Sequence, residues 1–210
     1  SEVPSGQKCN CICAACLQPF EARKGTRRRH HFAHVSNYEC MYASEVAIYK
    51  AFAEALKQSG FLTLPPVMLR FPAWHDPELL QEARRLKIDS VAFECEPLSY
   101  PPLLRVTMQG TPLRILLDFD RYYDDDDRVE LAEEAKVEDY SLLLISMPKI
   151  EQDTEFTPDR LQSVLQDNDR TEWVFSRLEE QWKQKYYAVA VSPPEHGTGN
   201  LCPISFGKYK

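Results

Sequence analysis

The first residues that could do chemistry are cysteines and histidines near the N-terminus. Cys13 and Cys16 are separated by two residues, so one tight turn can direct both thiolates at a single ion. His31 and His34 follow after fourteen intervening residues, a length that suits a short β-hairpin. We expect Cys13, Cys16 and His34 to be ligands of a tetrahedral Zn²⁺ with a structural role. The fourth ligand is either His31 or Cys40.

The alternative is that these cysteines are free thiols or form disulfides. The sequence shows neither a signal-peptide pattern nor an apolar membrane span, so we expect no membrane partner and a cytoplasmic, reducing location. Metal binding is favoured over disulfides in that compartment. A structural zinc ion would stabilise a small module by about 10 kcal/mol. Burial of Phe20 or Phe32 would contribute only roughly 2–3 kcal/mol each.

Length and charge set the remaining limits. The 210 residues suffice for one ordinary domain and a small appendage. The net charge of −7 argues against a general nucleic-acid coat protein, but the charge is unevenly distributed. Basic residues gather at the tip of the expected hairpin, where they either contact phosphates or form a solvated turn: Arg23, Lys24, Arg27, Arg28 and Arg29.

An acidic block between residues 118 and 127 ends in four consecutive aspartates, Asp124 to Asp127. Such a run could attract a divalent cation or a basic partner. It is more often the solvated start of a helix, because acidic side chains are favoured at helix N-termini.

Local patterns predict a mixed α/β protein. Apolar runs and alternating residues predict strands at 17–21, 28–32, 61–71, 88–94, 104–108, 113–119 and 140–147, with one last strand near 204. Capping residues, prolines and helical periodicity predict helices at 45–58, 77–86, 127–135, from 157 onward, and at 173–184. The order strand, helix, strand after residue 113 implies a parallel crossover.

Particular residues support these predictions. Ser44 can cap the first helix, and Gly60 follows its end. Two prolines at 65–66 interrupt the apolar segment 61–71, which is therefore either a strand entered through a kink or two short strands. The run 115–117 is apolar without alternation, which is typical of a strand covered on both faces. Thr157 precedes a proline and can cap a later helix.

Taken together, C-A-A-C, A-R-K-G, H-H-F-A-H, a further Cys and S-E at a helix start resemble the competence protein CoiA-like family. The resemblance spans roughly residues 9–183 and is strong over 9–58. It implies a zinc ribbon over 1–40 and a restriction-endonuclease-like core of the PD-(D/E)xK type over 41–192, followed by a tail over 193–210. Such a core is an α/β fold with a mixed sheet flanked by helices.

Phosphodiester hydrolysis needs carboxylates that hold Mg²⁺, a metal-activated water and usually a lysine. The resemblance implies one carboxylate on the first helix, which Glu45 matches, although a first-turn Glu is also favoured by the helix dipole. It implies an acid-x-lysine pair on a core strand, where Asp118 fits the acid. Asp120 stands at the lysine position. Loss of one such electrostatic stabiliser lowers a rate by roughly a hundred- to a thousandfold.

Two further positions depart from the family pattern. Tyr49 stands where the family often has a His on the first helix. The proline-aspartate element has no acid, because Leu103 follows the prolines at 101–102. Asp89 and Glu94 lie on an earlier strand and would need a different register to replace it.

We therefore expect a nucleic-acid-associated, nuclease-like protein with impaired catalysis, acting on DNA in processing, competence or defence. Its candidate phosphate contacts are Arg27, Arg28 and Arg29. One alternative is an active Mg²⁺-dependent deoxyribonuclease that uses Glu45, Asp118 and Asp120. Another is a non-catalytic scaffold subunit whose acidic block binds a protein partner.

Overall fold

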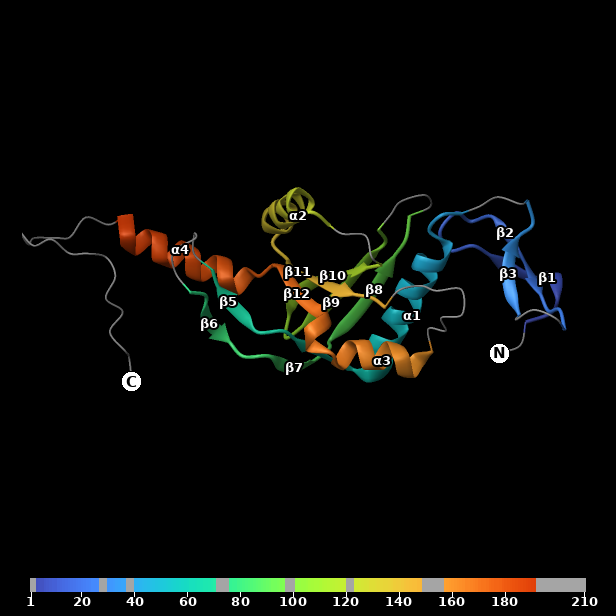
Figure 1. Cartoon of the computed structure of the whole chain (residues 1–210), viewed down its shortest axis with the longest axis horizontal. Helices are drawn as coiled ribbons and strands as arrows, with labels where there is room; N and C mark the ends of the chain where they lie inside the picture. The colour runs from blue at the N-terminus through green and yellow to red at the C-terminus, as the bar shows by residue number, and fades with distance from the viewer. Residues whose placement is uncertain are drawn as a thin grey trace, which may run out of the picture.

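The computed structural model describes residues 3–26, 30–36, 40–70, 76–96, 101–119, 123–148 and 157–191. These residues form four α-helices and several β-sheets, as a mixed α/β protein requires. Figure 1 shows an elongated molecule with a small N-terminal sheet at one end, a larger sheet in the middle and a projecting helix at the other end. Several predicted features lie outside the described residues: Arg27, Arg28, Arg29, Asp120, the tail over 193–210 and the strand near 204.

The N-terminal sheet has three antiparallel strands, β1 (Gly6–Ile12), β2 (Pro19–Arg23) and β3 (His31–His34), with β2 in the centre. We refer to this sheet and the loops between its strands as the ribbon. β2 begins two residues later than predicted because Leu17 has a φ of 59° and belongs to the preceding turn.

The central sheet has the strand order β12-β11-β10-β9-β8. Its members are β8 (Ser90–Glu94), β9 (Leu103–Met108), β10 (Thr111–Asp118), β11 (Ser141–Ser146) and β12 (Thr171–Phe175). β8, β9 and β10 form an antiparallel meander, β10 and β11 are parallel, and β12 runs antiparallel to β11. The predicted parallel crossover is therefore confirmed, with α2 (Asp125–Val137) as the connecting helix.

Helices cover both faces of the central sheet (Figure 1). α1 (Ala43–Ser59) and α3 (Pro158–Gln166) share one apolar cluster with Ile115 and Leu117 of β10. α2 lies on the opposite face, where Ala135 packs with Leu116 and Leu142. Because neighbouring residues of β10 enter different clusters, this strand is buried on both faces, as its unbroken apolar run predicted.

The predicted helix over 77–86 is wrong. The segment forms β6 (Glu78–Gln81) and β7 (Arg84–Lys87), while 61–69 forms β4 (Phe61–Leu64) and β5 (Val67–Leu69). β4 pairs with β7, and β5 pairs with β6. Leu62 of β4 pairs with Leu86 of β7 and is buried in the main core at 1% exposure. The burial gained by this strand pairing outweighs the local helix preference of the segment that begins with a proline.

The predicted helix over 173–184 is wrong at its start. Trp173 lies on β12 opposite Leu143, and its indole donates a hydrogen bond to the Pro65 carbonyl at 3.2 Å. α4 begins only at Arg177 and runs to Val191. No helix within the described ranges is both long and apolar enough to cross a membrane.

Two of the three predicted helix caps are confirmed, and one is wrong. Thr157 caps α3 as predicted, since its side chain accepts a hydrogen bond from the Arg160 amide at 3.3 Å. Ser44 does not cap α1: the helix begins at Ala43, and Tyr42 holds the cap position without a side-chain cap bond. Gly60 ends α1 in the left-handed conformation with a φ of 66°, as its position predicted.

Candidate metal centre

Three cysteines and one histidine meet at the junction of the ribbon and α1. One ligand atom from each of four residues lies within 4.8 Å of every other, and the residues are Cys13, Cys16, His34 and Cys40. Tetrahedral zinc with Zn–S near 2.3 Å and Zn–N near 2.0 Å puts its ligand atoms roughly 3.5–3.8 Å apart. The distance from Cys16 Sγ to His34 Nε2 is 3.2 Å. The chemistry and spacing of this group therefore fit a metal ion such as zinc.

A tight turn places the first two ligands. The Cys13 amide donates to the Gln18 carbonyl at 2.9 Å, and the Leu17 amide donates to the Cys13 carbonyl at 2.9 Å. Leu17 closes this turn in the left-handed conformation. Cys13 and Cys16 are both buried, at 1% and 8% exposure.

The other two ligands come from the end of β3 and the start of α1. His34 is the last residue of β3 and lies opposite Phe20, with the two ring centroids 4.5 Å apart. The Cys40 carbonyl accepts a hydrogen bond from the Ala43 amide at 3.3 Å, which leads directly into α1. We refer to the described residues from α1 onward as the body. A bound ion would therefore join the ribbon to α1, the first helix of the body.

The structure brings Cys40 to this group, whereas His31 is not part of it. His31 and His34 are three residues apart on one strand, and successive side chains of a strand point to opposite faces. His31 pairs opposite Arg23, while His34 pairs opposite Phe20. The two-residue gap between the histidines therefore cannot direct both rings at one ion.

Electrostatics favour a cation at this place. Burial, together with the neighbouring thiols of Cys13 and Cys40, raises the pKa of the Cys16 thiol to about 11, and the hydrogen bond with the Gln18 backbone opposes the rise. A divalent cation would reverse this balance at Cys16, because thiolates are its ligands. Behind the group, the Cys95 thiol donates a weak hydrogen bond to the Ala14 carbonyl at 3.5 Å.

Apolar residues surround the ligands. Val46 of α1 is fully buried and packs with Ala15 against Cys13 and Cys16. Phe93 of β8 is packed against this cluster and also against the main core. The metal group is thus continuous with the body and reaches the helix turn that carries Glu45.

A pair of carboxylates forms the second candidate site. Glu45 lies in the first turn of α1, and Asp118 ends β10. Tyr49 follows Glu45 by four residues and places its hydroxyl at β10, where it accepts a hydrogen bond from the Leu117 amide at 2.7 Å. Burial raises the Tyr49 pKa, the hydrogen bond with Leu117 opposes the rise, and the charges of Glu45 and Asp118 add to it. Glu45 Oε2 and Asp118 Oδ1 are buried.

The other predicted acids have separate positions. Asp89 accepts a hydrogen bond from the Gly110 amide at 3.0 Å, at the opposite end of β10 from Asp118. Glu94 lies 3.7 Å from the Arg105 guanidinium. Within the described part of the chain, the Cys/His group is the one set of three or more potential metal ligands, so Glu45 and Asp118 are not joined by a third described acid.

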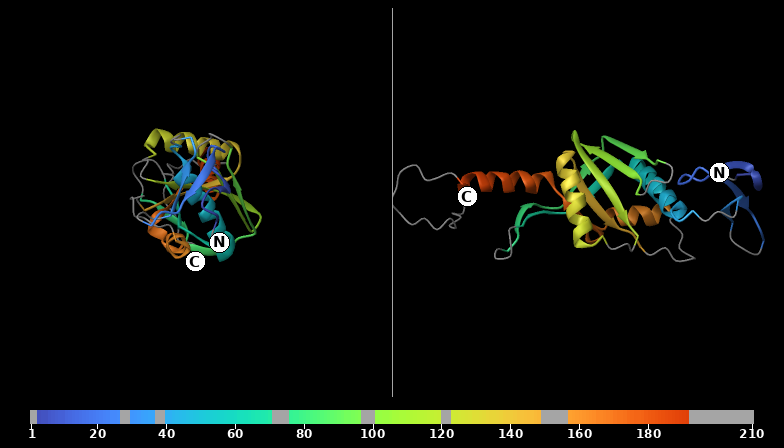
Figure 2. Two further views of the ribbon diagram at one scale, coloured as in Figure 1. Left: turned by 90° about the vertical axis from the view of Figure 1, so that its right-hand side faces the viewer. Right: turned by 90° about the horizontal axis from the view of Figure 1, so that it is seen from above.

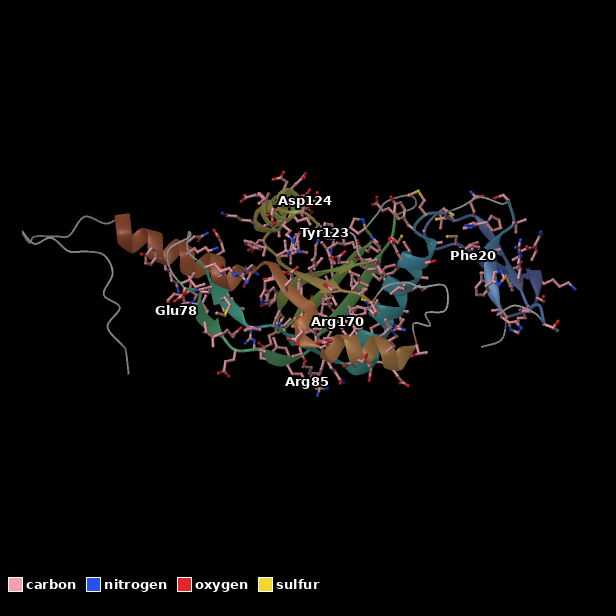
Figure 3. The ribbon with its side chains drawn as sticks, viewed as in Figure 1. Phe20, Glu78, Arg85, Tyr123, Asp124 and Arg170 are labelled. Carbon is pink, nitrogen blue, oxygen red and sulfur yellow. The ribbon has the colours of Figure 1, made fainter. Side chains whose placement is uncertain are left out.

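The aspartate run is a helix start. The Asp127 amide donates to the Asp124 carboxylate at 2.9 Å, and the Asp124 amide donates to the Asp127 carboxylate at 3.2 Å. This reciprocal pair is a capping box for α2. Figure 3 shows Asp124 and its neighbour Tyr123 at the beginning of that helix.

No protein-family model, curated protein or solved structure matches this chain. The fold and the site therefore define its class: a mixed α/β protein with a three-cysteine, one-histidine group that could hold a metal ion such as zinc.

Proposed function

We propose that this chain is a zinc-containing, nucleic-acid-associated protein of the CoiA-like type, with a restriction-endonuclease-like core whose nuclease chemistry is impaired. Its role would lie in DNA processing, competence or defence. The observation that carries the proposal is the contact between α1 and the end of β10: the Tyr49 hydroxyl bonds to Leu117, with Glu45 one helical turn before Tyr49 and Asp118 next to Leu117.

The order of elements supports the proposed core. A first helix with a carboxylate is followed by the β9–β10 hairpin, a crossover helix and a second apolar strand parallel to β10. This is the layout that the family resemblance implies. Asp118 lies at the end of β10, the strand on which that resemblance puts the acid-x-lysine pair.

The surroundings of the carboxylate pair support impaired catalysis. The Tyr49 hydroxyl accepts from the Leu117 amide and donates weakly to the Leu117 carbonyl at 3.4 Å, so it is committed to the backbone. A phenol is never positively charged, so Tyr49 brings no positive charge to a developing phosphate anion. Position 120, where a lysine would supply that charge, is an aspartate.

The same pair favours a second candidate function. Mg²⁺ is commonly held by one or two carboxylates together with substrate phosphates and water. Glu45 and Asp118 supply two carboxylates, so an active Mg²⁺-dependent deoxyribonuclease is the alternative, with Asp120 as its third acid.

One experiment separates the two functions. Labelled single-stranded and duplex DNA are incubated with the protein in Mg²⁺, in Mn²⁺ and in EDTA, and binding is titrated against salt. We expect binding that weakens as salt rises and no cleavage. If the protein cleaves DNA and Asp118→Ala abolishes the cleavage, the active Mg²⁺-dependent deoxyribonuclease replaces the impaired nuclease as the proposed function. Asp89→Ala is the matched control, because that acid serves the β9–β10 turn. Absence of binding at low salt would remove the nucleic-acid proposal altogether.

A further inference from the structure

A short row of rings crosses the ribbon from the metal group to solvent. The Phe20 ring lies 4.5 Å from His34 and 6.1 Å from Phe32, measured between centroids. The Phe20 and Phe32 rings are stacked at an interplanar angle of 29°. Phe32, the outermost ring, is 50% exposed. One end of the row is therefore held by a candidate ligand, and the other is open.

The described strands of the ribbon pack mainly on one another rather than on the body. Figures 1 and 2 show the ribbon at the end of the molecule, away from the central sheet and opposite the projecting α4. Figure 3 shows Phe20 in the ribbon, far from Glu78 on β6. Phe32 lies on β3 of this sheet and is among the exposed large apolar residues of the described structure.

Charge selects the kind of partner. Residues 1–40 contain six Lys or Arg and three Glu, a net charge of +3, which leaves −10 for residues 41–210 in a chain whose total is −7. Among the described cations of the ribbon, Lys8 is exposed, Lys24 is partly exposed, and Arg23 pairs with Glu21 at 2.7 Å. An anionic polymer is therefore attracted to the ribbon and repelled by the body.

We propose that Phe32 is a stacking platform for a base of single-stranded nucleic acid, with the cations of the ribbon contacting its phosphates. This inference rests on the proposed nucleic-acid association and names its substrate class. A flat exposed ring on a segment of net positive charge matches a polymer with flat bases and a phosphate backbone. Bases in a duplex are stacked on each other and are not available to Phe32, so the platform favours single strands.

The platform also depends on the metal group. Phe32 is supported by Phe20, and Phe20 is supported by His34. Removal of the ion would free the His34 ring and the turn that carries Cys13 and Cys16, so the orientation of the rings would be lost. Single-strand binding should therefore require the metal-loaded protein.

The test measures the affinity of the metal-loaded full chain for two labelled DNAs by fluorescence anisotropy. One is single-stranded oligothymidylate, and the other is the same strand paired with oligoadenylate. Phe32→Ala should weaken single-strand binding by about 5- to 150-fold, the range for loss of one stacked base, and should leave the salt slope unchanged. Phe32→Trp should restore binding. Phe61→Ala is the control for an exposed ring outside the ribbon, because Phe61 is 41% exposed on β4, where the Arg85 guanidinium lies 4.6 Å from its ring centroid. Metal content measured for each variant shows that the ribbon remains folded.

The outcomes separate the platform from the broader function. Equal affinity for both DNA forms with no effect of Phe32→Ala would overturn the platform, whereas salt-dependent binding would still support nucleic-acid association. Equal losses for Phe32→Ala and Phe61→Ala would also overturn the platform, because they would indicate general destabilisation. Absence of binding to either oligonucleotide would overturn both proposals.

Discussion

The Tyr49 hydroxyl accepts a hydrogen bond from the Leu117 backbone amide at 2.7 Å and so joins α1 to the central strand of the larger sheet. Glu45 lies one helical turn before Tyr49, and Asp118 directly follows Leu117. This contact therefore brings the helix turn of Glu45 to the end of β10 that carries Asp118. It also occupies an amide of a strand that is buried on both faces.

Tyr49→Phe should destabilise the protein by about 1–3 kcal/mol, because the buried Leu117 amide would lose its hydrogen-bond acceptor. The ring itself would keep its packing, since Tyr49 and Phe have nearly the same shape. The free energy of unfolding from urea denaturation measures the effect. An unchanged midpoint would mean that water or another acceptor replaces the phenol at no cost.

Stability should fall in strongly alkaline solution because of buried tyrosines. Burial raises the pKa of Tyr140 to about 12, with Glu134 adding to the rise and Arg114 opposing it. In the unfolded chain the same phenol ionises near pH 10, roughly its ordinary pKa. The contribution of neutral Tyr140 to the free energy of unfolding is therefore complete below about pH 10 and is lost as pH rises toward 12.

Denaturation midpoints measured across this alkaline range should decline in the wild type and decline less in Tyr140→Phe. Tyr49 shifts in the same direction, so the double variant Tyr49→Phe, Tyr140→Phe should show the flattest profile. A profile that is equally steep in all three proteins would show that neither phenol is responsible.

Metal content should follow the four-residue group. Purified protein should hold about one zinc ion per chain, and Cys40→Ser should lose it after dialysis against a weak chelator. His31→Ala should retain the ion, because His31 lies on the other face of β3. Cys95→Ser is the control for a nearby thiol outside the group. Loss of zinc from His31→Ala with retention in Cys40→Ser would reverse the assignment of the fourth ligand.

Two helix starts should respond differently to loss of a polar side chain. Asp124→Ala removes the acceptor of a capping box and should destabilise the protein by about 0.5–2 kcal/mol. Ser44→Ala should change stability by less than about 0.5 kcal/mol, because Ser44 is exposed inside α1 and does not cap it. Thermal or urea unfolding of both variants gives the comparison. Equal losses would show that Ser44 has a role that its position does not explain.

Short-range signals were the most dependable guide to this fold. The strands predicted at 104–108 and 113–119 form the β9–β10 hairpin. Gln109 and Gly110 between them take positive φ values of 51° and 72° in a tight two-residue turn, so β10 begins at Thr111 rather than at 113. Thr157 and Gly60 mark a helix start and a helix end because each acts on the backbone within a few residues. These interactions need no partner from a distant part of the chain.

Long-range pairing decided the segments where prediction failed. Residues 77–86 carry a helix-like pattern, but β4 and β5 offer them strand partners, and Leu62 and Leu64 are buried in the core on that side. Trp173 could belong to the helix after it, but it lies on β12, the edge strand that pairs with β11. Neither partner is visible from the local sequence.

By itself the sequence determined that a cysteine pair two residues apart, two histidines and Cys40 are available for one metal ion, and that an α/β core follows. Only the tertiary structure decided that Cys40 rather than His31 completes the group with His34, because alternation along a strand directs the two histidine rings to opposite faces. It also decided that the helix turn of Glu45 meets the end of β10 that carries Asp118, since α1 and β10 meet only when the core packs.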